Sequence, residues 1–202
     1  MTIGTHLKEQ DKQLHRITTM KILILRASGR PQGFSHRLAE EFEKGAAESG
    51  HNVENYDCTL HNVRGCLGCN FCAEHDGVCG QKDDFADIAA KMTDADILVF
   101  AFPVYYFGVP GQLTTIIDRT YSLNFAPKPL SDKKSALLIS QGQPSLAPTF
   151  PVFGMCREIE KAYNWTYCGE VIAKGLNAFV PLDTIDSMPC LEEAYQLGKS
   201  LK

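Results

Sequence analysis

The strongest constraint on the fold is an alternation that starts at residue 20, between continuous apolar segments and segments whose apolar residues recur every three or four positions. A continuous apolar run predicts a parallel strand buried on both faces, and the three-to-four spacing predicts an amphipathic helix. Strands are predicted at KILILRA (21–27), NVENYDC (52–58, weaker and edge-like), DILVFAF (96–102), KKSALLIS (133–140) and TYCGEVIA (166–173). Five strands separated by helices predict an open, doubly wound α/β sheet, with DILVFAF at its centre.

The segments between these strands carry their apolar residues on one face, as amphipathic helices do. Helices are predicted over 35–50, 83–95, 109–123, around 148–163 and over 191–202. Asp83 or Asp84 is available to cap the second helix, and Pro110 stands at the start of the third. The buried face of the third helix is predicted to carry Leu113, Ile116, Ile117 and Tyr121.

Residues 1–19 are polar and aperiodic, and they are predicted to be a flexible extension before a single domain over 20–202. A domain of this length with 44% hydrophobic and 22% charged residues has enough apolar material for a core. The net charge of −4, without any Lys/Arg-rich block, argues against nucleic-acid binding. The apolar runs are too short and too interrupted for a membrane span, and no secretory signal is visible, so a cytoplasmic protein without membrane attachment is expected.

The loop after the first strand, RASGRPQGFSHRL (26–38), is the first candidate functional segment. In a doubly wound sheet the ligand lies beyond the carboxyl ends of the strands. This loop combines small residues and hydroxyls with the cation Arg30, and N–H groups at a helix start form an anion site. It has neither the Walker nor the dinucleotide glycine pattern. Two interpretations stay open, a phosphate site and an ordinary turn in which Ser35 caps the helix.

Two further loops leave the same edge of the predicted sheet. In FPVYYFGVPGQ (102–112), Pro103 must end the central strand because proline cannot donate to the ladder. The three consecutive aromatic residues that follow cannot all face one core, so at least one should point outward, toward a planar ligand or toward another subunit. In SQGQP (140–144), Gly142 permits close approach of the backbone to a flat ligand, although the motif alone predicts only a turn.

Taken together, ASGRPQGFSHRL, FPVYYFGVPGQLTTIIDR and SQG resemble the NADPH-dependent FMN reductase family of flavodoxin-like proteins. The resemblance runs from about Met20 to the end, and its most specific part is the aromatic segment followed by PGQL and IIDR. It implies a five-stranded parallel sheet in the order 2-1-3-4-5 between two layers of helices. Two positions depart from the common form, with Ala27 in place of glycine and Phe34 in place of asparagine.

The resemblance also implies bound FMN, with NAD(P)H as a transient reductant. It assigns Ser28, Arg30, Phe34 and Ser35 to the phosphate, Pro103, Val104, Tyr105, Tyr106 and Phe107 to the flavin edge, and Gly142 to its far side. No catalytic side chain is required, because the flavin carries the reactivity. A domain of this size has no second nucleotide-binding unit, so reductant and acceptor are expected to use one flavin face in turn, by a ping-pong scheme.

A loop after the second strand holds half of the eight cysteines, Cys66, Cys69, Cys72 and Cys79, within GCLGCNFCAEHDGVCGQKDD (65–84). The spacing matches neither the two-cluster ferredoxin motif nor a zinc finger. Four thiolates in one loop suit a [4Fe–4S] cluster, and the spacing resembles that of iron–sulfur flavoproteins, a branch of the same family. Reduced thiols, a zinc site that includes His75, and a redox pair at Cys66 and Cys69 stay open as alternatives. The other four cysteines are predicted to be structural.

Three functions follow from these patterns. The first is an NAD(P)H-dependent flavin or quinone-type reductase that uses FMN. The second is an iron–sulfur flavoprotein electron carrier, and the third is a non-enzymatic, flavodoxin-like binding or regulatory module. The expected partner is a small-molecule or protein electron acceptor, together with further copies of the chain, as a dimer or tetramer that covers the flavin edge.

Overall fold

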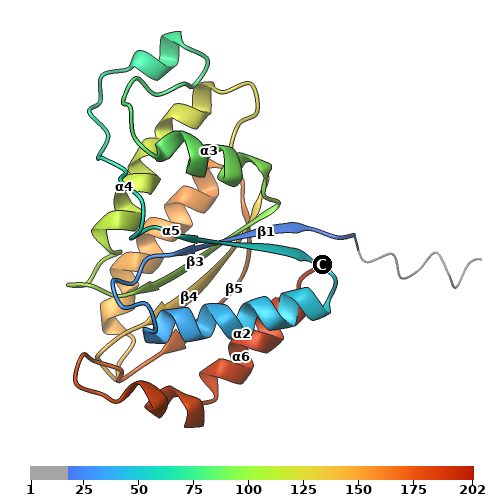
Figure 1. Cartoon of the computed structure of the whole chain (residues 1–202), viewed down its shortest axis with the longest axis vertical. Coiled ribbons are helices and arrows are strands. Elements are labelled where there is room, and N and C mark those ends of the chain that lie inside the picture. The colour runs from blue at the N-terminus through green and yellow to red at the C-terminus, as the bar shows by residue number, and fades with distance from the viewer. Residues whose placement is uncertain (1–17) are drawn as a thin grey trace, which may run out of the picture.

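The computed structural model describes residues 18–202 and contains one five-stranded, fully parallel sheet (Figure 1). The strand order β2-β1-β3-β4-β5 confirms the predicted doubly wound, flavodoxin-like topology. The predicted extension over 1–19 falls almost wholly outside the described residues, so the proposed domain division stays a prediction. The strands are β1 (Lys21–Arg26), β2 (Asn52–Asp57), β3 (Ile97–Pro103), β4 (Lys134–Ser140) and β5 (Thr166–Ala173).

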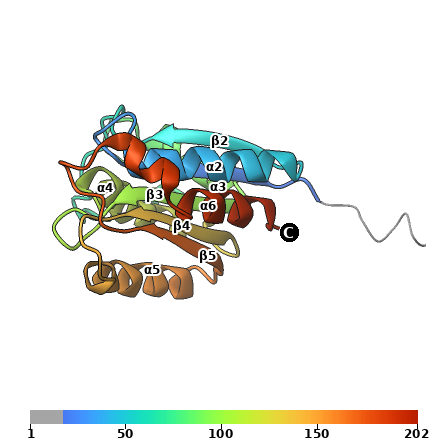
Figure 2. The same cartoon turned by 90° about the horizontal axis from the view of Figure 1, so that it is seen from below.

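Helices cover both faces of the sheet and complete a three-layer structure. In Figure 1, α2 and α6 lie below the sheet and α3 and α4 lie above it, and Figure 2 shows the molecule from below. Helix α5 shares the core of α3 and α4 and so covers the same face as they do. The helices are α2 (Phe34–Glu48), α3 (Phe85–Asp94), α4 (Gly111–Arg119), α5 (Phe150–Ala162) and α6 (Cys190–Lys199). Short 3₁₀ helices are η1 (Phe71–Glu74), η2 (Thr120–Phe125), η3 (Ala147–Thr149) and η4 (Leu182–Ser187).

Successive residues of the inner strands are buried on opposite faces of the sheet. In β1, Leu23 and Leu25 join the core under α3, α4 and α5, whereas Ile22 and Ile24 join the core under α2 and α6. All seven residues of β3 are buried or half-buried, which agrees with its central position. The edge strand β2 is more exposed, as its weaker apolar pattern predicted. The continuous apolar runs therefore follow from two covering layers.

The strand order reverses at β1, because β2 pairs with one edge of β1 and β3 pairs with the other. Such a switch point separates the loops that follow the two strands and opens a crevice between them. The loops after β1, β3 and β4 therefore share the edge at which a ligand is expected. Within residues 18–202, no helix has both the length and the apolar character needed to cross a membrane.

Candidate functional site

The three predicted loops converge on a cleft of about 260 Å³ at the carboxyl edge of the sheet. Seven of the ten residues predicted to bind FMN line it: Ser28, Arg30, Phe34, Pro103, Val104, Tyr105 and Gly142. Six further residues line the cleft: Gly33, Ser140 and Gln141, which belong to the predicted loops, and Leu176, Asn177 and Ala178, for which sequence reasoning named no role. The remaining predicted residues, Ser35, Tyr106 and Phe107, lie near the cleft in sequence but do not line it.

The loop after β1 is a tight turn whose shape requires a glycine. The Gly33 N–H donates to the Arg30 carbonyl at 2.8 Å, and the Arg30 N–H donates to Ser28 Oγ at 3.2 Å. A Cβ on Gly33 would lie 2.7 Å from Ser28 Oγ, closer than real side chains approach. The small residues noted in the sequence are therefore needed to fold the loop back against the start of α2.

Ser35 does not cap α2 as one interpretation of the sequence predicted. The helix begins one residue earlier, so Gly33 occupies the N-cap position and Ser35 lies within the first turn, where no side-chain capping bond forms. Its Oγ is fully buried and has no hydrogen-bond partner in the described part of the chain. The first turn of α2 also lacks an acidic residue. A buried hydroxyl without a partner, at the positive end of a helix, fits an anionic ligand group such as a phosphate.

The aromatic loop after β3 forms a two-residue hairpin turn. Tyr105 and Gly108 exchange two backbone hydrogen bonds of 3.0 Å, and Tyr106 and Phe107 between them have φ angles of +50° and +67°. Two positive φ angles define a type I′ turn, which favours Asn and Gly and is strained for bulky residues. Tyr106 is 99% exposed, and Phe107 is also exposed. Tyr105 alone of the three lines the cleft, while the other two project beyond it.

The far side of the cleft combines the loop after β4 with the loop after β5. A Cβ on Gly142 would lie 3.2 Å from Asn177 Cβ, so glycine allows these loops to pack closely. The Gln141 amide donates to the carbonyls of Gln143 and Ser145, which leaves its buried Oε1 without a partner among the described residues. The SQG motif marked this loop, but the contribution of Asn177 had no local sequence signal.

The cysteine loop, Cys66–Cys79, follows β2 in the chain. One of its four thiols is buried, and the other three are more accessible. Cys66 and Cys69 are exposed, Cys79 is half-buried, and Cys72 is buried. Burial has the largest influence on the pKa of Cys72 and raises it, and negative charge on the other three thiols of the loop raises it further. All eight cysteines are free thiols, and Cys58, Cys156 and Cys190 are buried in the two cores.

The residues of this loop fit an iron–sulfur cluster by donor type, because four free thiols occur where such a cluster needs four ligands. The sulfurs are not gathered into a finished site: within residues 18–202 no group of three or more His, Cys, Asp or Glu side chains is arranged to hold a metal. The ring of His75 stacks on Phe71, and its Nδ1 lies 2.8 Å from the Phe71 carbonyl oxygen. A backbone contact at Nδ1 is compatible with a metal at Nε2, so the alternative zinc site that includes His75 stays a hypothesis.

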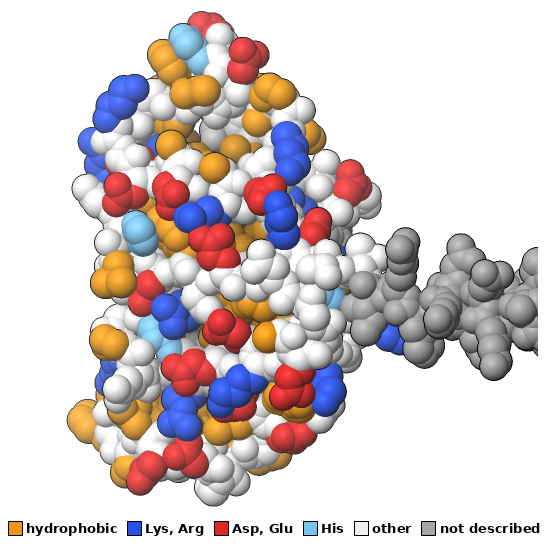
Figure 3. Space-filling view, turned by 45° about the vertical axis from the view of Figure 1, so that its right-hand side comes forward, with side chains coloured by type: hydrophobic (Ala, Val, Ile, Leu, Met, Phe, Trp, Pro, Cys, Tyr) orange, Lys and Arg blue, Asp and Glu red, His pale blue; other side chains and the backbone are white. Residues whose placement is uncertain are grey.

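Charged side chains of both signs are interspersed on the face that Figure 3 shows, and basic residues do not gather there into a stripe. Among residues 18–202, six exposed large apolar side chains lie between β2 and α3 or in η2: Leu60, Leu67, Phe71, Val78, Tyr121 and Phe125. Seven others follow β3, β4 or β5. They come from three successive connections: Tyr105, Tyr106 and Phe107 after β3, Leu146 and Phe150 after β4, and Phe179 and Leu182 after β5. These seven residues define a crest beside the cleft, called the aromatic crest below.

Comparison with known proteins agrees with this geometry. Residues 20–155 match the family model described as NADPH-dependent FMN reductase. An iron–sulfur flavoprotein of Methanocaldococcus jannaschii is 36% identical over 104 residues, which cover 52% of this chain and 53% of that protein. An iron–sulfur flavoprotein of Archaeoglobus fulgidus is 25% identical over 182 residues, 90% of this chain and 79% of that protein. The chain thus spans about half the length of the first relative and most of the second.

Among solved structures, the NAD(P)H:quinone oxidoreductase of Methanothermobacter marburgensis superposes with a TM-score of 0.68. The two are 21% identical, and the superposition covers 91% of this chain and 96% of the other. At this identity the likeness establishes the shared fold.

Proposed function

The chain belongs to the NADPH-dependent FMN reductase family, and from this premise we propose that it is an FMN-dependent oxidoreductase that accepts hydride from NAD(P)H. One observation supports the proposal above the others: the buried, unpartnered hydroxyl of Ser35 at the start of α2, beside a cleft built from the three family loops. A phosphate group is the ligand part that this position suits.

The chain's own residues would hold FMN by its two ends. Ser28, Arg30 and Ser35, with the N–H groups at the start of α2, would bind the phosphate, while Val104, Tyr105 and Gly142 would line the ring. When bound, FMN supplies the hydride chemistry, so the protein has to bind it, orient it and keep one ring face accessible. Pro103 assists by ending β3 at the cleft, because the ladder stops where proline cannot donate.

The kinetic scheme that we propose is ping-pong, because the cleft offers one place for reductant and acceptor. Among the described residues, the lining of the cleft contains no second glycine-rich loop of the kind that binds a nucleotide. NAD(P)H would therefore leave before the acceptor enters. We expect parallel double-reciprocal plots with NADPH and a quinone, and competitive inhibition of the acceptor by excess NADPH. Intersecting plots would contradict the scheme.

The reductase activity itself is tested by mixing the FMN-loaded protein with NADPH under anaerobic conditions. Rapid loss of the flavin absorbance, followed by its return when a quinone is added, would support the proposal. A protein that binds FMN but is not bleached by NADPH or NADH would instead support the non-enzymatic binding module.

An iron–sulfur centre in the cysteine loop is the second candidate function. It is favoured by the four free thiols within one loop and by the similarity to iron–sulfur flavoproteins. Cys66, Cys69, Cys72 and Cys79 would hold the cluster, which would carry single electrons to or from a protein partner. The test is iron and acid-labile sulfide in anaerobically prepared protein. Replacing Cys72 by serine should abolish both, whereas replacing the half-buried Cys168 should change neither.

We also propose that the aromatic crest is covered by a second copy of the chain. Phe179 is 94% exposed and follows Ala178, which lines the cleft, and Phe150 is 64% exposed at the start of α5. Contiguous exposed apolar patches mark interaction surfaces in soluble proteins. A dimer or tetramer in size-exclusion chromatography that becomes monomeric in Phe179→Glu would support this proposal. A wild-type monomer with FMN bound would contradict it.

A further inference from the structure

Arg119, the last residue of α4, is a buried cation whose hydrogen bonds reach back to the chain around the cysteine loop. Its side chain is 1% exposed, and Nη1 donates to Asp83 Oδ2 at 2.8 Å and to the Arg64 carbonyl at 2.9 Å. Nη2 donates to Asp83 Oδ1 at 3.2 Å. The guanidinium carbon also lies 4.5 Å from the centre of the Phe85 ring. The two-pronged contact to Asp83 fixes both the position and the orientation of the guanidinium plane.

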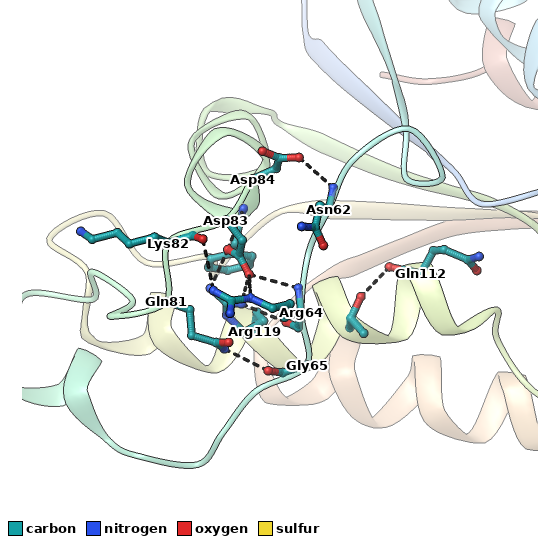
Figure 4. A network of polar contacts seen from close by, with 11 residues as sticks. Asn62, Arg64, Gly65, Gln81, Lys82, Asp83, Asp84, Gln112 and Arg119 are labelled. Atoms are coloured by element: carbon teal, nitrogen blue, oxygen red, sulfur yellow. Dashed lines mark hydrogen bonds and ion pairs between the residues drawn. The ribbon is translucent and has the colours of Figure 1, made fainter.

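These contacts belong to a neck that closes the cysteine loop, as Figure 4 shows. The Arg64 N–H donates to Asp83 Oδ2 at 3.0 Å, and Gln81 Nε2 donates to the Gly65 carbonyl at 2.9 Å. The segment that enters the loop is thus bonded to the segment that leaves it. Arg119 contributes to both, because it donates to Arg64 on the entering side and to Asp83 on the leaving side.

Arg119 and the last cysteine of the loop belong to the wall of one cavity of about 200 Å³. Cys79, Arg119 and Phe85 are among the residues that line this cavity. The buried Nε of Arg119 has no hydrogen-bond partner within residues 18–202. Arg119, with a buried and unpartnered N–H donor, and Cys79 are therefore both residues of this cavity's lining.

We propose that Arg119 is a positioning residue of the cysteine loop, which holds the neck closed and directs its positive charge toward the sulfur of Cys79. This inference rests on the second candidate function, an iron–sulfur centre in that loop. Arg119 would then act on the centre through a ligand sulfur, without being a ligand itself. Hydrogen bonds to ligand sulfurs and nearby charge are two properties that set the reduction potential of such centres.

The sign of the effect follows from charge. Reduction adds an electron to the centre, so a nearby cation stabilises the reduced form and raises the reduction potential. Asp83 opposes Arg119, because its carboxylate offsets part of the guanidinium charge. Loss of the Arg119 charge should therefore lower the potential, whereas loss of the Asp83 charge should raise it. Both changes break the same buried ion pair, so general loss of stability cannot produce shifts of opposite sign.

The experiment uses full-length protein, loaded anaerobically with iron and sulfide and titrated redox-potentiometrically with detection by electron paramagnetic resonance. In Arg119→Gln we expect the oxidised-to-reduced ratio at a fixed potential to rise about tenfold, equivalent to a fall of about 59 mV for a one-electron couple. Asp83→Asn should shift the potential upward. Arg119→Lys keeps the charge and should keep a potential close to that of the wild type. Arg64→Gln is the matched control, because it removes an exposed cation 3.7 Å from Asp83 and the 3.1 Å hydrogen bond of Arg64 Nη2 to the Lys82 carbonyl, but no buried charge.

The outcomes test the positioning role of Arg119 and the iron–sulfur candidate separately. Opposite shifts for Arg119→Gln and Asp83→Asn, with little change for Arg64→Gln, would support the inference. Shifts in the same direction, or no shift, would overturn it and leave the iron–sulfur candidate intact. A wild-type protein that takes up no iron would overturn both, while the proposed FMN reductase activity would still be judged by its own test.

Discussion

Gly45 in α2 and Gly198 in α6 let the backbones of these two helices touch. A Cβ on Gly45 would collide with the Tyr195 carbonyl oxygen and lie 2.9 Å from the Lys199 nitrogen. A Cβ on Gly198 would collide with the Phe42 carbonyl oxygen and lie 3.0 Å from the Ala46 nitrogen. Close packing of α6 thus supports α2, whose first turn contains the proposed phosphate site.

Replacing Gly198 by alanine should lower the free energy of unfolding by about 1–3 kcal/mol, because the added methyl group forces the helices apart. Urea denaturation measures this effect. Gly154→Ala in α5 is the matched control, since its Cβ would meet no atom within 4 Å. That substitution should stabilise the protein by about 0.5–1 kcal/mol. Equal effects of the two substitutions would show that α2 and α6 are not in contact.

Replacing Ser35 by alanine should weaken FMN binding roughly tenfold to a hundredfold, because a hydrogen bond to a charged group contributes about 1.5–3 kcal/mol. Fluorescence titration of the cofactor-free protein measures the affinity. Riboflavin, which lacks the phosphate, provides the control ligand, and its affinity should be the same for the variant and the wild type. A parallel loss of riboflavin affinity would indicate that Ser35 does not act at the phosphate.

Asp83 should make the protein sensitive to acid. Burial opposes its ionisation, but hydrogen bonds from Arg119 and from the N–H groups of Arg64 and Phe85 outweigh burial and lower its pKa to about 2. Because the pKa is depressed in the folded protein, the stabilisation is complete above about pH 4 and is lost as the pH falls toward 2. The loss should be about 2 kcal/mol in the free energy of unfolding.

The acid effect is measured by urea denaturation of the wild type and of Asp83→Asn at a series of pH values. Asp83→Asn should be less stable at neutral pH, because it leaves the Arg119 charge buried without its partner. Its stability should also vary less between pH 4 and pH 2. If both proteins lose stability equally over this interval, another carboxylate is responsible.

The turn at Tyr106 and Phe107 should be strained for a functional purpose. The double replacement Tyr106→Asn and Phe107→Gly installs the pair that a type I′ turn favours, so the free energy of unfolding should rise by about 1 kcal/mol or more. Turnover with a quinone should fall at the same time, because the exposed rings are lost from the aromatic crest. A decrease in stability would show that the two aromatic residues contribute to folding.

The layered sheet was predictable because burial on both faces leaves a continuous apolar pattern in each inner strand. Helix boundaries were harder to predict. Tyr121 was predicted on the buried face of the third helix, but it is exposed, because α4 ends at Arg119 and the chain continues as 3₁₀ helix η2. The change from about 3.6 to 3.0 residues per turn rotates the following side chains to another direction.

The three cleft loops were predictable from glycine, proline and aromatic residues at strand ends. The positions of Asn177 and Arg119 were not predictable. Asn177 lines the cleft only because β5 lies beside β4, which no local pattern specifies. Arg119 is paired with a residue 36 positions earlier, and a single arginine at the end of a helix ordinarily predicts a solvent-exposed side chain.

The closed neck makes the cysteine loop a detachable insert. Its two ends are bonded to each other and to α4, while Cys79 also packs against the core that α3, α4 and α5 cover. We expect exchange of residues 66–79 for a short linker to keep the sheet and to remove the proposed iron–sulfur site. The two proposed sites, for a cluster and for FMN, would then be separable parts of one chain.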